Sequence, residues 1–277
     1  MSVHQKIAFV GAGNMASALI RGLIGTATVP ADEIIAADPE RERIGALAEQ
    51  LGIRTTRDNA EAVREATVIV LATKPQVFAQ LLPGIAAAMP PDALLVSIAA
   101  GIPTARIERS LPAGSRVVRT MPNTPALVGA GATAIAAGRH ATDADLDLVE
   151  TLFRSVGIAV RVPEAQIDAV TGLSGSGPAY VFAMIEALRD AGAREGLPEQ
   201  TALRLASQTV FGAARLLLDQ KETPEVLRER VTSPGGTTRA GLDALAAAGF
   251  ADAILDAVHA ATRRSAELGK VAEGAPG

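Results

Sequence analysis

The chain has 277 residues, with 26 Lys and Arg against 30 Asp and Glu for a formal net charge of −4, and it contains no Cys. A cysteine nucleophile, a disulfide framework and a thiolate metal site are therefore excluded. Three scattered His residues argue against a multi-His metal site, and the mildly acidic balance argues against an electrostatically driven nucleic-acid binder. The length predicts about two domains.

The composition also bears on location and assembly. Apolar stretches such as 93–102 have roughly half the length that a bilayer requires. We therefore expect a cytoplasmic protein without membrane or nucleic-acid partners. Hydrophobic residues make up 48% of the chain but aromatic residues only 3%, so most apolar side chains are small and each buries little area. A large subunit interface compensates for such a deficit, which favours a homo-oligomer.

Strand and helix signals alternate along the chain as far as Pro163. Runs rich in β-branched residues predict strands at Lys6–Val10, Glu33–Ala37, Thr67–Ala72, Ala93–Ile98, Ser115–Thr120, Ala132–Ala136 and Ile158–Val162. The intervening segments predict helices at Met15–Gly25, Arg41–Leu51, Asn59–Glu65, Val77–Ala87 and Asp143–Ser155. This alternation is typical of an α/β fold with a doubly wound parallel sheet.

The strand signals disappear after Pro163. The second part of the chain predicts helices at Ala165–Thr171, Tyr180–Glu195, Pro198–Asp219, Pro224–Val231 and Thr237–Lys270, some of them broken by Gly. We therefore expect residues 1–163 to form the α/β domain and residues 164–277 to form an all-helical domain.

The turn between the first predicted strand and the first helix reads GAGNMA over residues 11–16, which fits the pattern G-x-G-x-x-G/A. Gly11 permits a tight turn, Gly13 lets the backbone approach a pyrophosphate, and Ala16 allows close helix–strand packing. The helix N-terminus attracts phosphates. The pattern alone is compatible with an ordinary tight turn, but at this junction it predicts a Rossmann domain that binds a dinucleotide.

The identity of the dinucleotide stays open at this point. Asp38 ends the second strand, where an acid accepts hydrogen bonds from the adenosine ribose and repels a 2′-phosphate. Arg41 and Arg43 follow within one helical turn, and a guanidinium binds a phosphate well. The alternative for both arginines is a solvated helix face. The sequence is thus compatible with either NADPH or NADH.

Three segments that follow predicted strands are rich in turn formers: ATKP (72–75), AAG (99–101) and MPNTP (121–125). The ligand crevice of an open α/β sheet lies outside the carboxyl ends of the strands, so we expect all three to line it. No acid–base group stands out, because His4, His140 and His259 fit structural or exposed positions better. The glycine-rich stretch 172–180 lacks Lys, which argues against β-hydroxyacid dehydrogenase chemistry.

Another glycine-rich turn, TSPGGTT (232–238), joins two predicted helices in the second part of the chain. Such a turn at a helix N-terminus exposes N–H groups that can hold a carboxylate. The alternative is a plain Pro-Gly turn in which Ser233 or Thr237 caps the helix.

Together these motifs resemble those of the pyrroline-5-carboxylate reductase family. The resemblance covers about residues 5–270 and rests on IAFVGAGNMASALIRGL (7–23), ATKP (72–75), SIAAGI (97–102), RTMPNTP (119–125), LSGSGPAYVF (173–182) and VTSPGGTTRAGL (231–242). It implies an N-terminal Rossmann domain, a C-terminal helical dimerisation domain, and an intertwined dimer that is commonly assembled into a decamer. It also implies the reduction of 1-pyrroline-5-carboxylate to L-proline, the last step of proline biosynthesis, by hydride transfer from NADPH or NADH to the cyclic imine.

The resemblance and the glycine turn together give the expected site residues. On the cofactor side these are Gly11, Ala12, Gly13, Asn14, Met15, Asp38, Arg41, Asn59, Ala72, Thr73, Lys74, Pro75, Ala100, Gly101, Pro122 and Asn123. On the substrate side, the resemblance implies that Ser233, Gly235, Gly236, Thr237 and Thr238 of the partner subunit hold the carboxylate. It also implies that Thr238 is the catalytic residue, which hydrogen-bonds and protonates the ring nitrogen.

Two positions depart from the family pattern. Asp38 stands where NADPH-preferring members often carry a small, polar or basic residue, and Arg239 replaces an apolar residue. Two alternative functions also remain open: a reductase of another imine or small carbonyl substrate, and a non-catalytic nucleotide-sensing homologue. The intact MPNTP and SPGGTT motifs argue against the second alternative, because a scaffold needs neither.

Overall fold

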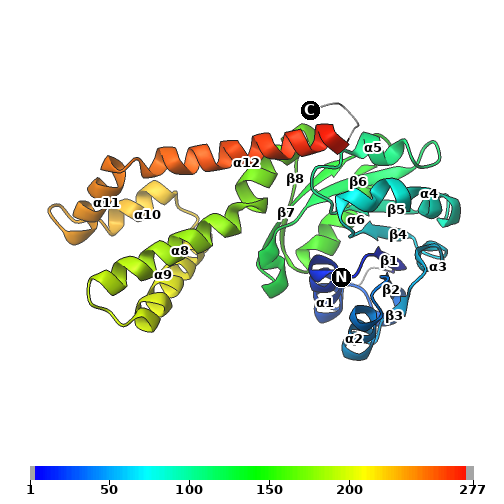
Figure 1. Cartoon of the computed structure of the whole chain (residues 1–277), viewed down its shortest axis with the longest axis horizontal. Coiled ribbons are helices and arrows are strands. Elements are labelled where there is room, and N and C mark those ends of the chain that lie inside the picture. The colour runs from blue at the N-terminus through cyan, green and yellow to red at the C-terminus, as the bar shows by residue number, and fades with distance from the viewer. Residues whose placement is uncertain (1–3, 273–277) are drawn as a thin grey trace. The chain divides into compact units, whose positions relative to one another are not determined.

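The computed structural model describes residues 4–272 and contains one eight-stranded sheet (Figure 1). Its strands are β1 (Ile7–Val10), β2 (Ile34–Ala37), β3 (Arg54–Thr56), β4 (Val68–Leu71), β5 (Leu94–Ser97), β6 (Arg116–Met121), β7 (Gly131–Ala137) and β8 (Gly157–Arg161). Their order is β3-β2-β1-β4-β5-β6-β7-β8. The order reverses between β1 and β4, which is the switch point of a doubly wound sheet.

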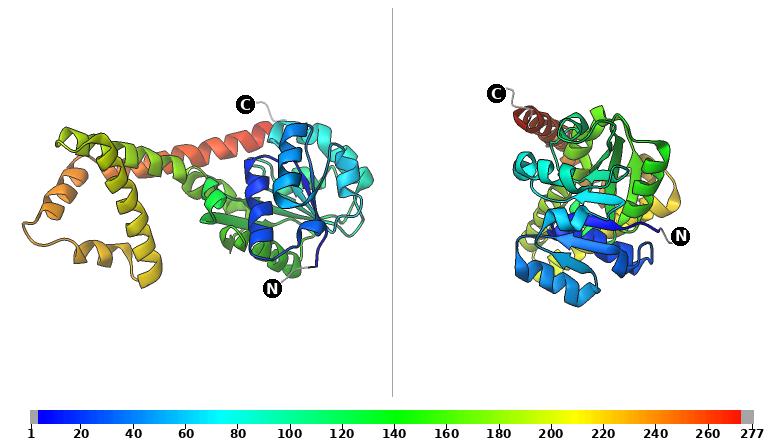
Figure 2. Two further views of the ribbon diagram at one scale, coloured as in Figure 1. Left: turned by 90° about the horizontal axis from the view of Figure 1, so that it is seen from below. Right: turned by 90° about the vertical axis from the view of Figure 1, so that its right-hand side faces the viewer.

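Helices cover both faces of the sheet. One face carries α1 (Asn14–Gly25), α2 (Arg41–Leu51) and α6 (Asp143–Arg154), and the other carries α3 (Asn59–Val63), α4 (Phe78–Ala88) and α5 (Thr104–Glu108). Successive residues of a strand point to opposite faces, so Phe9 belongs to one core and Val10 to the other. Burial on both faces explains why the strands are continuous apolar runs. The layers can be followed from two further directions in Figure 2.

Each strand and helix predicted for this region is present, and α2 has the predicted bounds. Two short elements, β3 and α5, were not predicted. Strand β3 has three residues at the sheet edge and none of them is buried, so it has no apolar run. In α5 only Thr104 and Ile107 are buried, which is too little to give a helical period.

The sheet departs from the predicted parallel arrangement at one pair of strands, because β7 runs antiparallel to β6. A short 3-10 segment, Thr124–Val128, connects them. A connection of this length cannot make the crossover that parallel neighbours require. The following strand, β8, is parallel to β7 because α6 supplies a crossover between them.

The remaining helices are α7 (Ile167–Val170), α8 (Gly177–Arg194), α9 (Glu199–Gln220), α10 (Pro224–Arg230), α11 (Thr237–Ala247) and α12 (Phe250–Ala272), with a π-helical turn at Thr171–Gly175. Gly249 has a φ of 72° and divides the stretch that the sequence predicted at Thr237–Lys270. Helices α8 and α9 lie side by side (Figure 1). Their close approach depends on small residues, since a Cβ at Gly192 would lie 3.1 Å from the Cβ of Ala202.

Contacts divide the chain into two compact units. Unit 1 comprises Met1–Ser176 and Ala260–Gly277, and unit 2 comprises Gly177–His259. The domain boundary between residues 163 and 164 stays a prediction. Among residues 4–272, no single helix is long and apolar enough to cross a membrane, and only α11 with α12 up to Lys270 passes that test as a pair bent by 52°.

Candidate active site

The carboxyl ends of β1, β2 and β4 meet at one edge of the sheet, and Gly11 forms the turn there. Its N–H donates to the carbonyl oxygen of Ala37 at 2.8 Å, and its φ is 97°. A Cβ at Gly11 would lie 2.7 Å from the carbonyl oxygen of Ala72. No side chain can therefore replace this glycine without moving the end of β4.

The N-terminus of α1 follows this turn. Gly13 is the N-cap, no side chain caps the helix, and no acidic residue lies in its first turn. A Cβ at Gly13 would meet nothing within 4 Å, and Asn14 is exposed. The first N–H groups of a helix have no partner within the helix and attract anions. Ala16 is 1% exposed, which fits its predicted packing role.

Thr73 adds a polar atom beside the glycine turn. Its methyl group lies 2.9 Å from the Cβ position of Gly11. Its hydroxyl oxygen is buried and has no hydrogen-bond partner among the residues that the structure describes. An unpaired buried hydroxyl is costly unless a ligand completes it. The turn, the uncapped helix and this hydroxyl together fit the pyrophosphate of a dinucleotide.

Asp38 lies one residue beyond β2 and is 5% exposed. Its carboxylate accepts from the N–H of Ala12 at 2.9 Å and from the N–H of Glu40 at 3.0 Å. Arg43 donates to both carboxylate oxygens, at 3.1 and 3.0 Å. Burial raises the pKa of the Asp38 carboxyl, but these hydrogen bonds and the Arg43 charge outweigh burial and hold that pKa below its ordinary value.

The adenosine side of the expected site lies near α3. Asn59 is the first residue of α3 and half-buried, and it lines a pocket of ≈ 470 Å³ together with Arg57 and residues of α4. Asp58 caps α3 by accepting the N–H of Ala60 at 2.8 Å. Arg41 is exposed at the start of α2 and, unlike Arg43, does not contact Asp38.

The segments after β4 and β5 lie on the same edge. The N–H of Ala72 donates to the carbonyl oxygen of Val10 at 2.8 Å, which fixes the start of ATKP against β1. Pro75, Ala100 and Gly101 line a mainly apolar pocket of ≈ 440 Å³. Lys74, the residue before Pro75, is exposed. The nicotinamide end of the expected site therefore has a preformed apolar wall.

Asn123 is held by both ends of its side chain. Its carbonyl oxygen accepts the N–H of Ala132 at 2.8 Å, and its amide donates to the carbonyl oxygen of Ser174 at 3.0 Å. Asn123 thus ties the MPNTP segment to the π-helical turn Thr171–Gly175 within unit 1. Pro122, the residue before it, is buried at the end of β6.

The substrate-side residues form the turn between α10 and α11 in unit 2. Helix α11 begins at Thr237 after Gly236, without a side-chain cap and without an acidic residue in its first turn. A Cβ at Gly236 would lie 2.3 Å from Oγ of Ser233, and Gly235 has a φ of 69°. Ser233, Thr237 and Thr238 are exposed. The turn therefore presents free N–H groups and hydroxyls, as a carboxylate site requires.

Arg239 does not disturb this turn. Its guanidinium lies 3.7 Å from Asp243, one helical turn further along α11. The departure from the family pattern is thus accommodated by an ion pair on the helix surface.

The structure gathers the expected cofactor residues on unit 1 and the expected substrate residues on unit 2. Their assignment as site residues stays a prediction. The sequence predicted that either Arg41 or Arg43 could bind a phosphate, and only Arg41 was included in the expected site, whereas the contact with Asp38 is made by Arg43. The sequence contains no signal that separates two arginines on the same helical turn.

Comparisons with known proteins identify relatives for both parts of the chain. The pyrroline-5-carboxylate reductase dimerisation family matches residues 164–268, and the family described as NADP oxidoreductase coenzyme F420-dependent matches residues 6–101. A pyrroline-5-carboxylate reductase from Methanosarcina acetivorans is 46% identical over 96% of this chain and 99% of its own length. One from Pseudomonas aeruginosa is 47% identical over 95% of this chain and 96% of its own length.

Solved structures show the same similarity. The pyrroline-5-carboxylate reductase from Coxiella burnetii has a TM-score of 0.92 and 37% identity, covering 96% of this chain and 99% of its own. The pyrroline carboxylate reductase from Plasmodium falciparum, solved with NADP bound, has a TM-score of 0.86 and 30% identity, covering 97% of this chain and 100% of its own.

Proposed function

The chain belongs to the pyrroline-5-carboxylate reductase family, and on this premise we propose that it reduces 1-pyrroline-5-carboxylate to L-proline with NADPH or NADH. The observation that carries the proposal is the match to reductases of that name over nearly the whole chain. The glycine turn and the uncapped N-terminus of α1 support dinucleotide binding independently.

On the cofactor side, the N–H groups of Gly13, Asn14 and Met15 would hold the pyrophosphate, and Asp38 would face the ribose. Ala100, Gly101, Pro122 and Asn123 position the nicotinamide. When bound, the reduced nicotinamide supplies the hydride that the imine carbon accepts. The work of the protein is mainly positioning, because a protonated imine is already a strong electrophile.

On the substrate side, the N-terminus of α11 holds the carboxylate through its free N–H groups. The Thr238 hydroxyl hydrogen-bonds the ring nitrogen and passes it a proton that comes from water. Because no strong acid is needed, this role fits a turn, TSPGGTT (232–238), that contains no His, Cys or Lys. Gly235, with a φ of 69°, is the glycine that the conformation of the SPGGTT turn requires.

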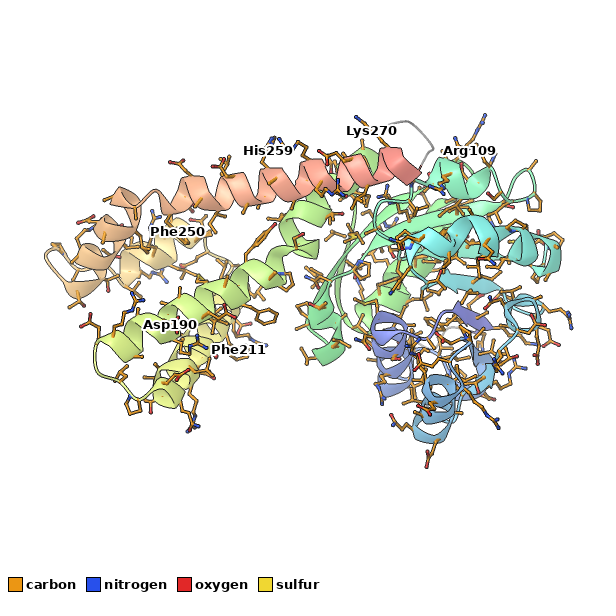
Figure 3. The ribbon with its side chains drawn as sticks, viewed as in Figure 1. Arg109, Asp190, Phe211, Phe250, His259 and Lys270 are labelled. Carbon is orange, nitrogen blue, oxygen red and sulfur yellow. The ribbon has the colours of Figure 1, made fainter. Side chains whose placement is uncertain are left out.

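The active assembly is a homodimer in which the turn of one subunit completes the cofactor site of the other. Support comes from the dimerisation family match and from large apolar side chains that unit 2 exposes. Leu218 is 73% exposed, Leu255 66% and Phe211 63%; Phe211 and Phe250 are labelled in Figure 3. A second copy of the chain covers such a surface. Assembly of dimers into a decamer, a cytoplasmic location and the absence of nucleic-acid and membrane partners stay predictions.

The direct test follows cofactor oxidation by absorbance while proline is quantified by amino-acid analysis. We expect stoichiometric loss of NADPH or NADH and gain of proline with 1-pyrroline-5-carboxylate, and slower turnover with cyclic imines that lack the carboxylate. No oxidation with this substrate, or equal rates for imines without the carboxylate, would contradict the proposal.

The role of Thr238 is tested by Thr238→Ala, with Thr238→Ser as the matched control that keeps the hydroxyl. We expect the alanine variant to lose about 10²-fold in kcat, the usual size for one proton-transfer or oriented hydrogen-bond contribution. The affinity for the dinucleotide should stay unchanged, and the serine variant should keep most of the activity. Wild-type kcat in Thr238→Ala would remove Thr238 from the mechanism.

A further inference from the structure

The carboxylate of Asp38 is fully occupied in this structure. A carboxylate offers about four acceptor positions. One oxygen accepts from the N–H of Ala12 and from Arg43, and the other accepts from the N–H of Glu40 and from Arg43. A ribose hydroxyl can reach Asp38 only by taking a position that one of these donors now holds.

The donors differ in how easily they can leave. The N–H groups of Ala12 and Glu40 belong to the glycine turn and to the residue before α2, so the backbone fixes them. The Arg43 side chain is 41% exposed, whereas that of Asp38 is 6% exposed. Arg43 also forms an ion pair with Glu40 at the surface. The Arg43 guanidinium is therefore the donor of the cluster that has access to solvent.

The two dinucleotides place opposite demands on this cluster. NADH presents a 2′-hydroxyl, which donates to a carboxylate. NADPH presents a 2′-phosphate, which a buried carboxylate repels and a guanidinium binds by paired hydrogen bonds. A side chain that can either cover Asp38 or turn away from it meets both demands.

We propose that Arg43 is the residue that admits NADPH to this site: it neutralises Asp38 and binds the 2′-phosphate. When NADH binds, Arg43 withdraws and leaves Asp38 to the ribose hydroxyls. Arg41, on the same turn of α2, does not contact Asp38 and therefore does not neutralise it. The inference rests on the dinucleotide use proposed above and deepens it.

The test measures the dissociation constants of NADPH and NADH by calorimetry on the full chain without any imine. Arg43→Ala should lower the affinity for NADPH by about tenfold or more, the loss expected for a charge-assisted hydrogen bond. The affinity for NADH should stay within about twofold of wild type. Arg41→Ala tests the neighbouring arginine and should weaken NADPH binding less than Arg43→Ala does. The matched control is Arg109→Ala, which changes an exposed arginine at the end of α5 outside the expected site and should change neither constant. Asp38→Asn should shift the preference toward NADPH, and Arg43→Lys should keep part of the NADPH affinity.

Two results would overturn the inference. One is an equal loss of affinity for both nucleotides in Arg43→Ala, which would make Arg43 a structural support for the turn. The other is a loss of affinity for NADPH in Arg41→Ala that is as large as the loss in Arg43→Ala. If Arg43→Ala does not fold, as judged by circular dichroism, the ratio of the NADPH and NADH dissociation constants is measured in Arg43→Lys and Asp38→Asn instead.

The binding assay separates this inference from the proposed reaction. Suppose that both nucleotides bind with the expected ratio of affinities but 1-pyrroline-5-carboxylate is not reduced. This result would contradict the proposed reaction and leave the Arg43 assignment standing. Failure of both nucleotides to bind would overturn both.

Discussion

At Asp38, the fold gathers polar groups that are far apart in sequence around one carboxylate. The N–H of Ala12 comes from the glycine turn after β1, and Arg43 is the third residue of α2. The same contacts hold the turn in shape and lower the pKa of Asp38. A single residue thus links the conformation of the phosphate-binding turn to the charge that the ribose meets.

This link predicts a specific acid sensitivity. A carboxyl whose pKa is lower in the folded than in the unfolded chain adds stability above the unfolded value, near pH 4, and this stability is lost as the pH falls through the folded pKa. We expect the difference in unfolding free energy between wild type and Asp38→Asn to be largest at neutral pH. It should shrink below about pH 4, as measured by urea unfolding at a series of pH values.

The control for this prediction is Asp32→Asn, which changes an exposed acid shortly before β2. Because the Asp32 side chain is exposed, this substitution should change the free energy of unfolding little. A difference for Asp38→Asn that stays constant from neutral to acid pH would show that the carboxylate charge does not stabilise the turn.

Among the elements, α6 has the most complete start. Thr142 Oγ1 accepts the N–H of Asp145 at 3.2 Å, and Asp145 accepts the N–H of Thr142 at 2.8 Å. This reciprocal pair is a capping box. Asp145 is 3% exposed and also accepts from Arg116 of β6 at 2.7 Å. The cap therefore attaches α6 to the sheet as well as starting the helix.

Removing the cap should weaken unit 1. Thr142→Ala leaves the N–H of Asp145 without its acceptor, and we expect a loss of about 1–2 kcal/mol in the free energy of unfolding. Thr142→Ser, which keeps the hydroxyl, should lose much less. Urea denaturation followed by circular dichroism measures both. Equal stability of the alanine and serine variants would mean that the hydroxyl contributes nothing to the start of α6.

The elements also show what a sequence can and cannot specify. Strands such as β1 and β4 were predictable because burial on both faces demands an unbroken apolar run. Strand β3 was not, since Arg54–Thr56 gains its conformation only by pairing with β2 at the edge. The glycine turn was predictable because its spacing has one geometric purpose. The choice of Arg43 over Arg41 depends on side-chain direction at the start of α2, which no sequence period records.

At the scale of the whole molecule, the expected site residues are divided between the two units. The groups that are expected to hold the dinucleotide lie on unit 1. The SPGGTT turn lies on unit 2, whose helices expose large apolar side chains. If the dimer brings the turn of one subunit to the cofactor site of the other, each catalytic site belongs to two chains. Mixed dimers can test this arrangement without any knowledge of the interface.

Two inactive subunits should restore each other's activity when combined. Gly13→Glu places a carboxylate where the pyrophosphate binds, and it should fold because a Cβ there meets nothing within 4 Å. Thr238→Ala disables the turn and leaves the cofactor site intact. In a mixed dimer, the turn of the first variant then serves the cofactor site of the second. Random pairing should recover about one quarter of wild-type activity, because half of the dimers are mixed and each has one intact site.

The control mixes each variant with itself after the same unfolding and refolding, and neither mixture should gain activity beyond its own background. Sites made within one chain lead to a different result, because every chain in the mixed dimer then carries a defect in its own site. Activity of the mixed preparation no higher than the average of the two variants would therefore exclude a shared site. Recovery that rises with the fraction of mixed dimers, separated by differently charged tags, would assign the SPGGTT turn to the partner's cofactor site.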